Sequence, residues 1–328
     1  MQGDCSVVLE SASAQSLGTL AVIMTKTIIL TTLTLFLFAC KTSKLPADLT
    51  TSNAPTPPGT IKISNNLYFD KTEITNISYL EFMFWTEKTF GTNSNEFINI
   101  LPDTNVWSKL NIGYASLDTF YLRHPAYRDF PVVGVSYDQA TTYSNWRSDR
   151  VMEYLLIQKK RIPYIQNPPK DSVFTIDRYF NGQYYGVQPN QHFFIYPYYY
   201  LPDSTVYNQT SFFADSINAK NYKSCKKKFC ADKLLIDCNC LENKTYKTTA
   251  RPFGPDPTMG TNCVFCKKEL ITHLKGNVRE MTNTKSVFYG SSFIDSCKIP
   301  NNMCRQDTLQ VNSYTGFRNV CEYRQWKK

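Results

Sequence analysis

Apolar residues recur in the first third of the chain at spacings that predict a strand followed by a helix. Residues Asn66–Ile74 alternate in part between polar and apolar side chains, as a half-buried strand does. Tyr79, Phe82 and Met83 follow at helical spacing and would face a common core. Asn76 precedes them and is a residue type that caps helix N-termini. We therefore expect a strand that leads directly into a helix.

A second strand and helix are predicted further along. Residues Pro131–Tyr137 read PVVGVSY, an apolar run typical of a buried strand that ends where a helix starts. Ser136 and Gln139 have the spacing of a capping box, in which each side chain bonds a free backbone N–H group of the first turn. The predicted inner face of this helix continues through Ala140, Tyr143, either Trp146 or Arg147, Val151 and Leu155.

The middle of the chain gives weaker signals. Pro168 and Pro169 exclude a continuous helix there, because proline lacks the N–H group that a helix interior needs. Residues 183–262 show few regular patterns and are rich in aromatic residues, lysine and cysteine. Within them, the run Phe193–Tyr200 is compatible with a sugar- or partner-binding surface, but a buried strand is the interpretation we favour.

Short strands are predicted near the C-terminus. Gly276 and Asn277 form a turn dipeptide of the kind that accepts a positive φ. The segments 278–282 and 289–293 that follow have the length and composition of short strands.

The N-terminal stretch has the pattern of a bacterial lipoprotein signal. Lys26 is followed by the uncharged segment Thr27–Ala39, which is shorter than the roughly 20 residues that span a bilayer. The sequence Leu37-Phe38-Ala39-Cys40 places an apolar and a small residue before a cysteine, in the order of a lipobox. We predict lipidation at Cys40, a signal peptide over residues 24–39, and a misassigned start over residues 1–23.

The rest of the chain divides into a tether and one domain. Residues 40–60 are rich in threonine, serine and proline, which predicts a flexible tether. The remaining roughly 265 residues suit one large domain, 61–328, with an insertion at about 183–262. The 22 tyrosines and 21 phenylalanines of the chain supply ample core material. The net charge of +9 is spread over short lysine clusters, and nucleic acid is a poor partner for an exported protein.

Cysteine is concentrated in the C-terminal half. Apart from Cys5 and Cys40, all the cysteines lie between residues 225 and 321, and their number is odd. An oxidising compartment favours disulfides, with at least one thiol left free, bound to metal or paired between chains. The spacing also permits zinc, and the residues we expect to form one local cluster are Cys225, Cys230, Cys238, Cys240, Cys263 and Cys266.

Three C-terminal segments in order, HLKGNVREMT (273–282), YGSSF (289–293) and GFR (316–318), carry a family resemblance. They resemble the GNVWEW-, GGSF- and GFR-like elements of the formylglycine-generating enzyme (sulfatase-modifying factor) family. Upstream, EITN (73–76) and PVVGVSY match further elements. The HPAY segment (124–127) and the residues after Trp146 are similar to the gliding-motility and type IX secretion lipoproteins of Bacteroidota. The resemblance implies an α+β fold, formylglycine-generating-enzyme-like and C-type-lectin-like, with long irregular loops.

The resemblance also implies where the chemistry of the family would lie. Its enzymes hold Cu(I) with two thiolates, which soft copper prefers, at positions occupied here by Asp295 and Pro300. Cys297 and Cys304 are the nearest candidate catalytic residues, and a disulfide between them is the simpler account. Copper is therefore disfavoured.

The calcium-binding turn of the family is altered as well. By resemblance, Gly276 and Val278 would supply carbonyl oxygens and Glu280 a carboxylate, a set that suits Ca²⁺. The fourth position holds His273, which is a poor ligand for a hard ion. No other cofactor is indicated.

Together these features predict a lipid-anchored, non-catalytic scaffold or interaction protein of a bacterial envelope machine for gliding motility or type IX secretion. Its partners would be other envelope proteins and the membrane, and it would sit on the outer membrane and face the periplasm. Two alternatives stay open: a formylglycine-generating-type oxidoreductase that acts on cysteine, and a module that binds glycan or peptide.

Overall fold

Two four-stranded sheets form the β part of the fold. The computed structural model describes residues 53–189, 194–225, 255, 256, 258, 271–296, 304–306 and 311–327. The first sheet has the order β1-β2-β8-β3 and is antiparallel throughout, with strands at Thr60–Ser64, Leu67–Asp70, Val320–Gln325 and Ile195–Tyr200. The second has the order β6-β5-β4-β7, with strands at Cys304–Gln306, Val287–Tyr289, Arg279–Met281 and Thr315–Gly316. Its β4 and β7 are parallel.

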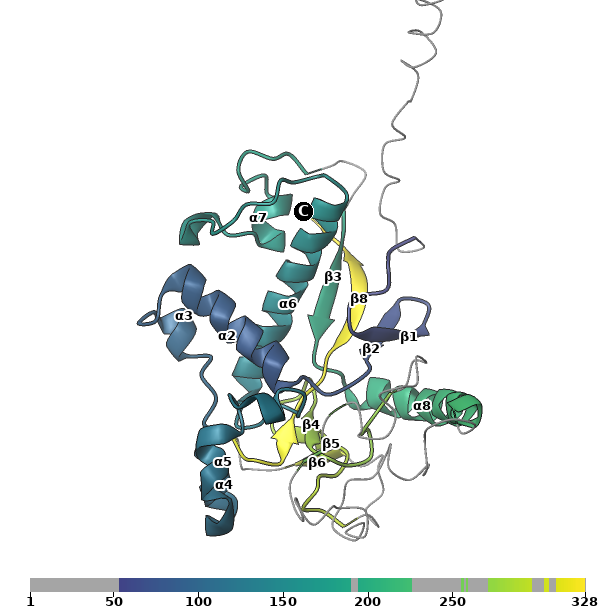
Figure 1. Ribbon diagram of the computed structural model, residues 1–328. Helices are drawn as coiled ribbons and strands as arrows, with labels where there is room; N and C mark the ends of the chain where they lie inside the picture. Colours follow the sequence, from purple (N-terminus) through teal and green to yellow (C-terminus); the bar gives the residue numbers. More distant parts are fainter. Residues whose placement is uncertain are drawn as a thin grey trace, which may run out of the picture. The chain divides into compact units, whose positions relative to one another are not determined.

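Helix α6 (Tyr137–Gln158) packs against β3 of the first sheet, and Figure 1 shows the two running side by side. Side chains of β3 alternate: Ile195, Pro197 and Tyr199 are buried, while the three tyrosines between and after them are half-buried. This alternation confirms the buried strand predicted in the aromatic run. Phe193 lies outside the described residues.

Strand β3 is an edge strand whose outer side cannot readily accept another strand. The Ser148 hydroxyl of α6 accepts a hydrogen bond from the Tyr199 N–H group at 2.8 Å, so this group points away from β8. Pro197 has the same parity on the strand and carries no N–H group at all. Helix cover and proline are both ways in which proteins prevent edge-to-edge association.

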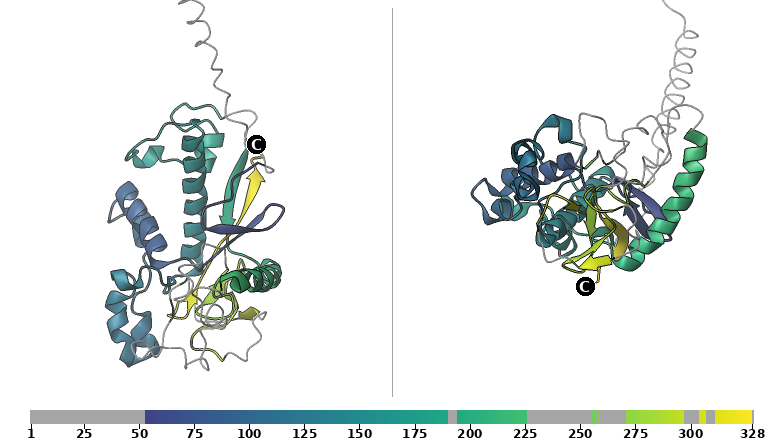
Figure 2. Two further views of the ribbon diagram at one scale, coloured as in Figure 1. Left: turned by 45° about the vertical axis from the view of Figure 1, so that its right-hand side comes forward. Right: turned by 90° about the horizontal axis from the view of Figure 1, so that it is seen from below.

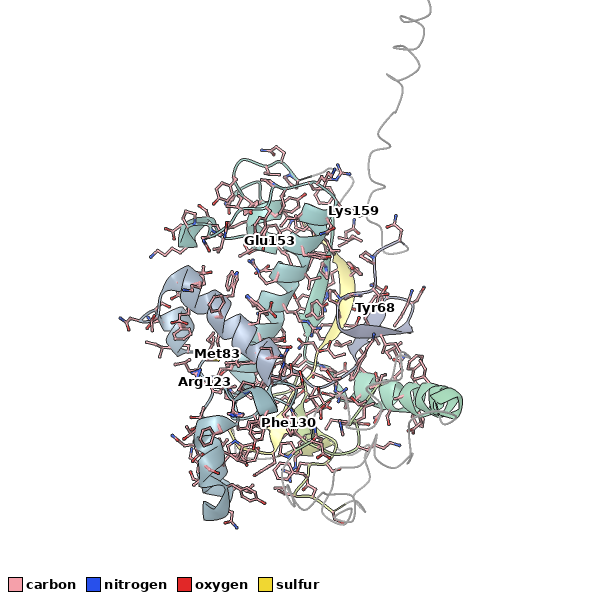
Figure 3. The ribbon with its side chains drawn as sticks, viewed as in Figure 1. Tyr68, Met83, Arg123, Phe130, Glu153 and Lys159 are labelled. Atoms are coloured by element: carbon pink, nitrogen blue, oxygen red, sulfur yellow. The ribbon has the colours of Figure 1, made fainter. Side chains whose placement is uncertain are left out.

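Helix α2 (Asn76–Phe90) buries Tyr79, Phe82 and Met83, as their spacing predicts; Figure 3 labels Met83. The cap is one residue earlier than predicted. Thr75 accepts the Ser78 N–H bond, and Asn76 is the first helical residue. The Asn76 amide instead donates to the carbonyl oxygens of Tyr121 and Tyr127, each at 3.0 Å.

The start of α6 confirms one prediction and corrects another. Ser136 and Gln139 form both hydrogen bonds of the capping box. The strand predicted over the preceding apolar run is wrong: only Pro131 makes a bridge, with Thr75. The run is buried, but Gly134 has a φ of 74° and turns the backbone away from ladder geometry.

Of the two strands predicted near the C-terminus, one is confirmed and one is wrong. Strand β4 lies within the predicted segment 278–282. The strand predicted over 289–293 is wrong, because β5 covers Val287–Tyr289 and the backbone turns at Gly290, which has a φ of 78°. Strand β7 contains only Thr315 and Gly316. Gly316 is required by packing, because a Cβ atom there would lie 2.9 Å from the Val132 carbonyl oxygen.

The sequence pattern predicted none of the remaining helices. Short helices occur at Asn95–Ile98 (α3), Val106–Leu110 (α4), Ala115–Phe120 (α5) and Ile176–Phe180 (α7), with 3₁₀ turns at Ile112–Tyr114, Pro125–Tyr127 and Lys170–Ser172. Helix α8 (Ser204–Cys225) falls in the stretch that showed few regular patterns, and Figure 2 shows it as one uninterrupted helix. Asp203 accepts the Val206 N–H bond at its start. In the described part of the chain, no helix is both long and apolar enough to cross a membrane.

Gly134→Ala tests the close approach of the Gly134 backbone to the Asp103 carbonyl oxygen. A Cβ atom there would lie 2.2 Å from the Asp103 carbonyl oxygen, whereas at Gly91, which also has a positive φ, nothing lies within 4 Å. Both variants carry the strain of a positive φ, but only Gly134→Ala adds a clash with backbone. We expect it to lower the free energy of unfolding by at least ~2 kcal/mol more than Gly91→Ala in urea titrations. Equal losses would contradict this account.

Candidate functional site

A buried ion cluster joins the sequence segments that carry the family resemblance. The Arg318 guanidinium donates to a Glu280 carboxylate oxygen at 2.8 Å and lies 4.0 Å from the Glu73 carboxylate. It also donates to the carbonyl oxygens of Asp70 and Thr272. All of these residues are buried. The EITN, GNVREMT and GFR segments therefore meet at one guanidinium.

Asn277 completes the cluster. This residue has a φ of 68°, which asparagine tolerates better than most residues. Its side-chain amide donates to Glu73 at 3.0 Å, and its oxygen accepts from the Asp256 N–H group at 2.6 Å. Its own carbonyl oxygen accepts from Phe293 N–H at 2.9 Å. The turn predicted at Gly276–Asn277 is thus fixed by hydrogen bonds from several segments.

One guanidinium faces two carboxylates in this cluster. Burial raises the pKa of Glu73 to about 8, against the lowering effect of Arg318. Burial likewise raises the pKa of Glu280, and Arg318 again opposes it. Because Glu280 holds the closer bonds to Arg318, Glu73 is the carboxyl that keeps a proton near neutral pH. The cluster is then close to electrically neutral.

The calcium ligands predicted by resemblance lie in the same place. Gly276 and Val278 belong to the buried turn, and the Glu280 carboxylate already pairs with Arg318. A cation at Glu280 would sit against the guanidinium, so this donor set does not fit Ca²⁺. Among the described residues, no three His, Cys, Asp or Glu side chains gather as they do around a metal ion. His273 is buried near this turn, with a φ of 57°.

Asp295, where the resemblance places the first copper thiolate, is held in an ion pair with the half-buried Arg279. Arg279 donates to both carboxylate oxygens, at 2.9 and 2.7 Å. The backbone N–H group and hydroxyl of Ser292 donate to the same carboxylate at 2.8 and 2.7 Å. Burial acts to raise the pKa of Asp295, but the bonds from Arg279 and Ser292 outweigh it and the pKa is lowered.

The two residues that differ from the family pattern therefore form an ion pair with each other. By resemblance, Arg279 stands where the family has a tryptophan and Asp295 where it has a cysteine, and each satisfies the other. The Arg279 guanidinium also lies 5.0 Å from the centre of the Tyr314 ring. A carboxylate fixed in this way is a hard, occupied ligand and cannot take the place of a thiolate for Cu(I).

The other predicted residues are placed only in part. Cys304 begins β6, where its backbone pairs with Tyr289. Its side chain, Cys297, Pro300 and Cys40 lie outside what the structure describes, as does most of the predicted cysteine cluster. Cys321 is a buried free thiol, and burial raises its pKa well above the ordinary value. One thiol thus stays free, which an odd number of cysteines permits.

The exposed side of β3 differs from a sugar-stacking platform. The Arg324 guanidinium lies 3.6 Å from the centre of the Tyr198 ring and 5.3 Å from that of Tyr200. Tyr198 and Tyr200 stack on one another with ring centres 5.3 Å apart. The guanidinium therefore covers the ring face that a sugar would need.

Sequence reasoning also missed a third ion pair, between Arg147 and Asp70. Arg147 on α6 donates to both oxygens of Asp70 at the end of β2, at 2.7 and 2.8 Å. The Asn319 N–H group donates to the same carboxylate at 2.8 Å. The only signal was the ambiguity between Trp146 and Arg147 on the inner face of the predicted helix.

This arrangement of helices, short strands and long loops is an α+β, formylglycine-generating-enzyme-like fold. The family described as sulfatase-modifying factor enzyme 1-like domain matches residues 37–209, and the chain belongs to that family. Among solved structures, the chain is similar to the one described as "Crystal Structure of CarF", with 16% identity, a TM-score of 0.37, and coverage of 80% of this chain and 87% of that one. No curated protein matches.

Glu73→Gln tests the protonated carboxyl. Because the pKa of Glu73 is raised in the folded state, the native protein holds a proton that the unfolded chain has lost between about pH 5 and pH 8. This group therefore makes stability fall as pH rises through that range. We expect the free energy of unfolding of Glu73→Gln, measured against pH, not to show this fall. The exposed Glu96→Gln is the control, and an unchanged slope in Glu73→Gln would show that Glu73 is ionised.

Proposed function

We propose that this protein is a lipid-anchored, non-catalytic interaction protein that uses the formylglycine-generating-enzyme fold as a scaffold. The observation that carries the proposal is the buried pair of Arg279 and Asp295 where the enzymes of the family need a thiolate. Removing one partner of this largely enclosed pair would leave a charge with little access to water, so the pair stabilises the local structure. The pair is thus a structural element and not a loosely occupied catalytic position.

The cellular setting follows from the sequence. The lipobox that ends at Cys40 supports anchoring to a membrane by lipid. The resemblance of the HPAY segment (124–127) to the lipoproteins of gliding motility and type IX secretion supports a place in such an envelope machine. The partners would be other envelope proteins, on the periplasmic face of the outer membrane.

A copper titration separates this proposal from an oxidase that uses Cys297 and Cys304. We expect the purified full chain to bind no stoichiometric Cu(I) against a competing chelator, because Asp295 replaces a thiolate. It should also leave the cysteine of a sulfatase peptide unconverted in a mass assay.

The matched controls are two double variants, Cys297→Ser with Cys304→Ser and Cys263→Ser with Cys266→Ser. Copper that disappears only in the first variant, together with formylglycine in the peptide, would overturn the scaffold proposal. Copper lost only in the second would reflect the separate cysteine cluster.

Cys40→Ala tests the anchor. Without the lipid acceptor, we expect the protein to move from the membrane fraction to the soluble fraction, because a firm anchor needs acyl chains. Ser43→Ala, in the predicted tether, is the matched control and should stay with the membrane. Metabolic labelling with a fatty acid provides the second readout, and label that persists on Cys40→Ala would contradict the proposal.

A further inference from the structure

The length of chain after the predicted lipid anchor determines which end of the domain stays nearest to it. Asn53 is the first residue that the structure describes and the thirteenth after Cys40. Fully extended, a chain of that length spans at most about 45 Å. The next residues are fixed in the domain, since Ala54 packs against a buried cluster and the Tyr323 hydroxyl donates to the Pro55 carbonyl oxygen at 2.8 Å. An anchor at Cys40 therefore keeps this end of the domain near the bilayer.

The same buried cluster gathers the end of α6 and the C-terminal end of the chain. Ile162, which follows α6, is buried within the cluster, and Trp326 packs against its edge. The Trp326 N–H group donates to the Phe194 carbonyl oxygen, and its ring stacks on that of Phe180. Figure 1 shows the C-terminal end, the end of α6 and the first described residues at one end of the domain, where Figure 3 labels Lys159.

The two chain segments at this end are basic. Residues 159–170 read KKRIPYIQNPPK and residues 325–328 read QWKK, which gives six lysines or arginines and no acidic residue. The nearest acids of α6 and β8, Glu153 and Glu322, are already paired with arginines. Two exposed aspartates follow the first segment along the chain and leave an excess of positive charge. This charge is complementary to an anionic surface.

Lys160 occupies a backbone position that glycine prefers. Its φ is 54°, and the Arg161 N–H group donates to the Leu156 carbonyl oxygen at 2.8 Å, which is the hydrogen bond of a Schellman cap. A side chain at this position carries strain that glycine would not. The helix dipole favours a cation at the helix end, which accounts for Lys159. Helix stability does not favour lysine over glycine at position 160, so the exposed lysine indicates a contact outside the domain.

An aromatic side chain projects from the same segment. Tyr164 is 73% exposed, although Ile162 and Ile165 on either side pack in or against the buried cluster. Tyrosine is enriched at membrane–water interfaces, where its ring meets the acyl boundary and its hydroxyl stays among the headgroups. Basic side chains beside an exposed tyrosine are the composition of a protein surface that lies on anionic lipid.

We propose that this end of the domain, defined by Lys159–Tyr164 and Lys327, docks on the anionic phospholipid headgroups of the bilayer that holds the anchor. The proposal rests on lipidation at Cys40. Each basic side chain near such a surface strengthens binding about fivefold, and the anchor supplies a high local concentration of headgroups. The docked domain presents its opposite end, with α4, α5 and the second sheet, away from the bilayer and toward partners (Figure 1).

The test uses the full chain, lipidated in cells, purified in detergent and reconstituted in vesicles of phosphatidylcholine with or without phosphatidylglycerol. Tyr164→Trp places a fluorescent reporter on the docking surface, and Phe212→Trp on α8 is the matched reporter, because Phe212 is 79% exposed. Brominated acyl chains quench tryptophan only at close range. We expect them to quench the Tyr164→Trp reporter in anionic vesicles. This quenching should be lost in neutral vesicles and at about 1 M salt, where the Debye length is about 3 Å.

Charge-removing variants of the Tyr164→Trp chain test the two lysines. Lys159→Gln with Lys160→Gly should shift the docking equilibrium about 25-fold toward the undocked domain. The fold should persist, since glycine relieves the backbone strain at position 160. Lys109→Gln with Lys285→Gln is the matched control. It removes the same charge from two exposed ion pairs, on α4 and before β5, and should dock as the parent chain does.

The possible outcomes separate docking from anchoring. Quenching that survives the variants at 159 and 160, or high salt, would overturn electrostatic docking. A lipidated chain that stays with the vesicles, while Tyr164→Trp is quenched no more than Phe212→Trp, would overturn docking and leave the anchor intact. This holds also if the same lysines bind an acidic peptide instead. A chain whose mass shows no fatty acid at Cys40 would overturn the anchor and the docking that rests on it.

Discussion

The side chain of Arg318 is the element on which the rest of the fold depends. It is fully buried, so each of its donors must find an acceptor inside the protein. Those acceptors come from the end of β2, from the segment before the turn at Gly276, and from β4. Segments separated by more than 200 residues are thereby brought to one point. A buried ion pair is weak support for stability as such, but an unpaired buried guanidinium would be very costly. We infer that the cluster mainly specifies which segments must meet.

Asp70 extends this constraint into a second network. Its carbonyl oxygen accepts from Arg318, while its carboxylate binds Arg147 and the Asn319 N–H group. Arg147 belongs to α6, so this helix and β4 of the second sheet are both linked to the same end of β2. The neighbouring residues Arg318 and Asn319 thus bind the end of β2 from two directions.

The sequence predicted what local patterns encode. The capping box of Ser136 and Gln139, the buried face of Tyr79 and Met83, and the alternating strand β3 follow from spacings of two to four residues. It could not predict the ion clusters, since Glu73, Glu280 and Arg318 are distant in the chain and no local pattern links them. The strand predicted at 131–137 does not form, because Gly134 has a positive φ and packs closely against the Asp103 carbonyl oxygen. No local pattern encodes this contact. Helix α8 was missed because its buried side, which includes Tyr207, Thr210 and Ala214, is interrupted by polar residues.

By resemblance, Arg279 and Asp295 stand at the positions of a tryptophan and a copper-binding cysteine, and here they form an ion pair. A cysteine thiolate that binds copper is buried, carries charge and depends on a metal ion for its stability. A carboxylate keeps the charge, but it needs a fixed cation in place of the metal, and the guanidinium of Arg279 supplies one from the adjacent strand. The Ser292 N–H group and hydroxyl also donate to the Asp295 carboxylate, so the protein's own groups satisfy this carboxylate. Replacing Asp295 alone would leave Arg279 buried beside a group that cannot neutralise it. A thiolate at position 295 would therefore have to be accompanied by a change at Arg279, so electrostatics couples the two positions.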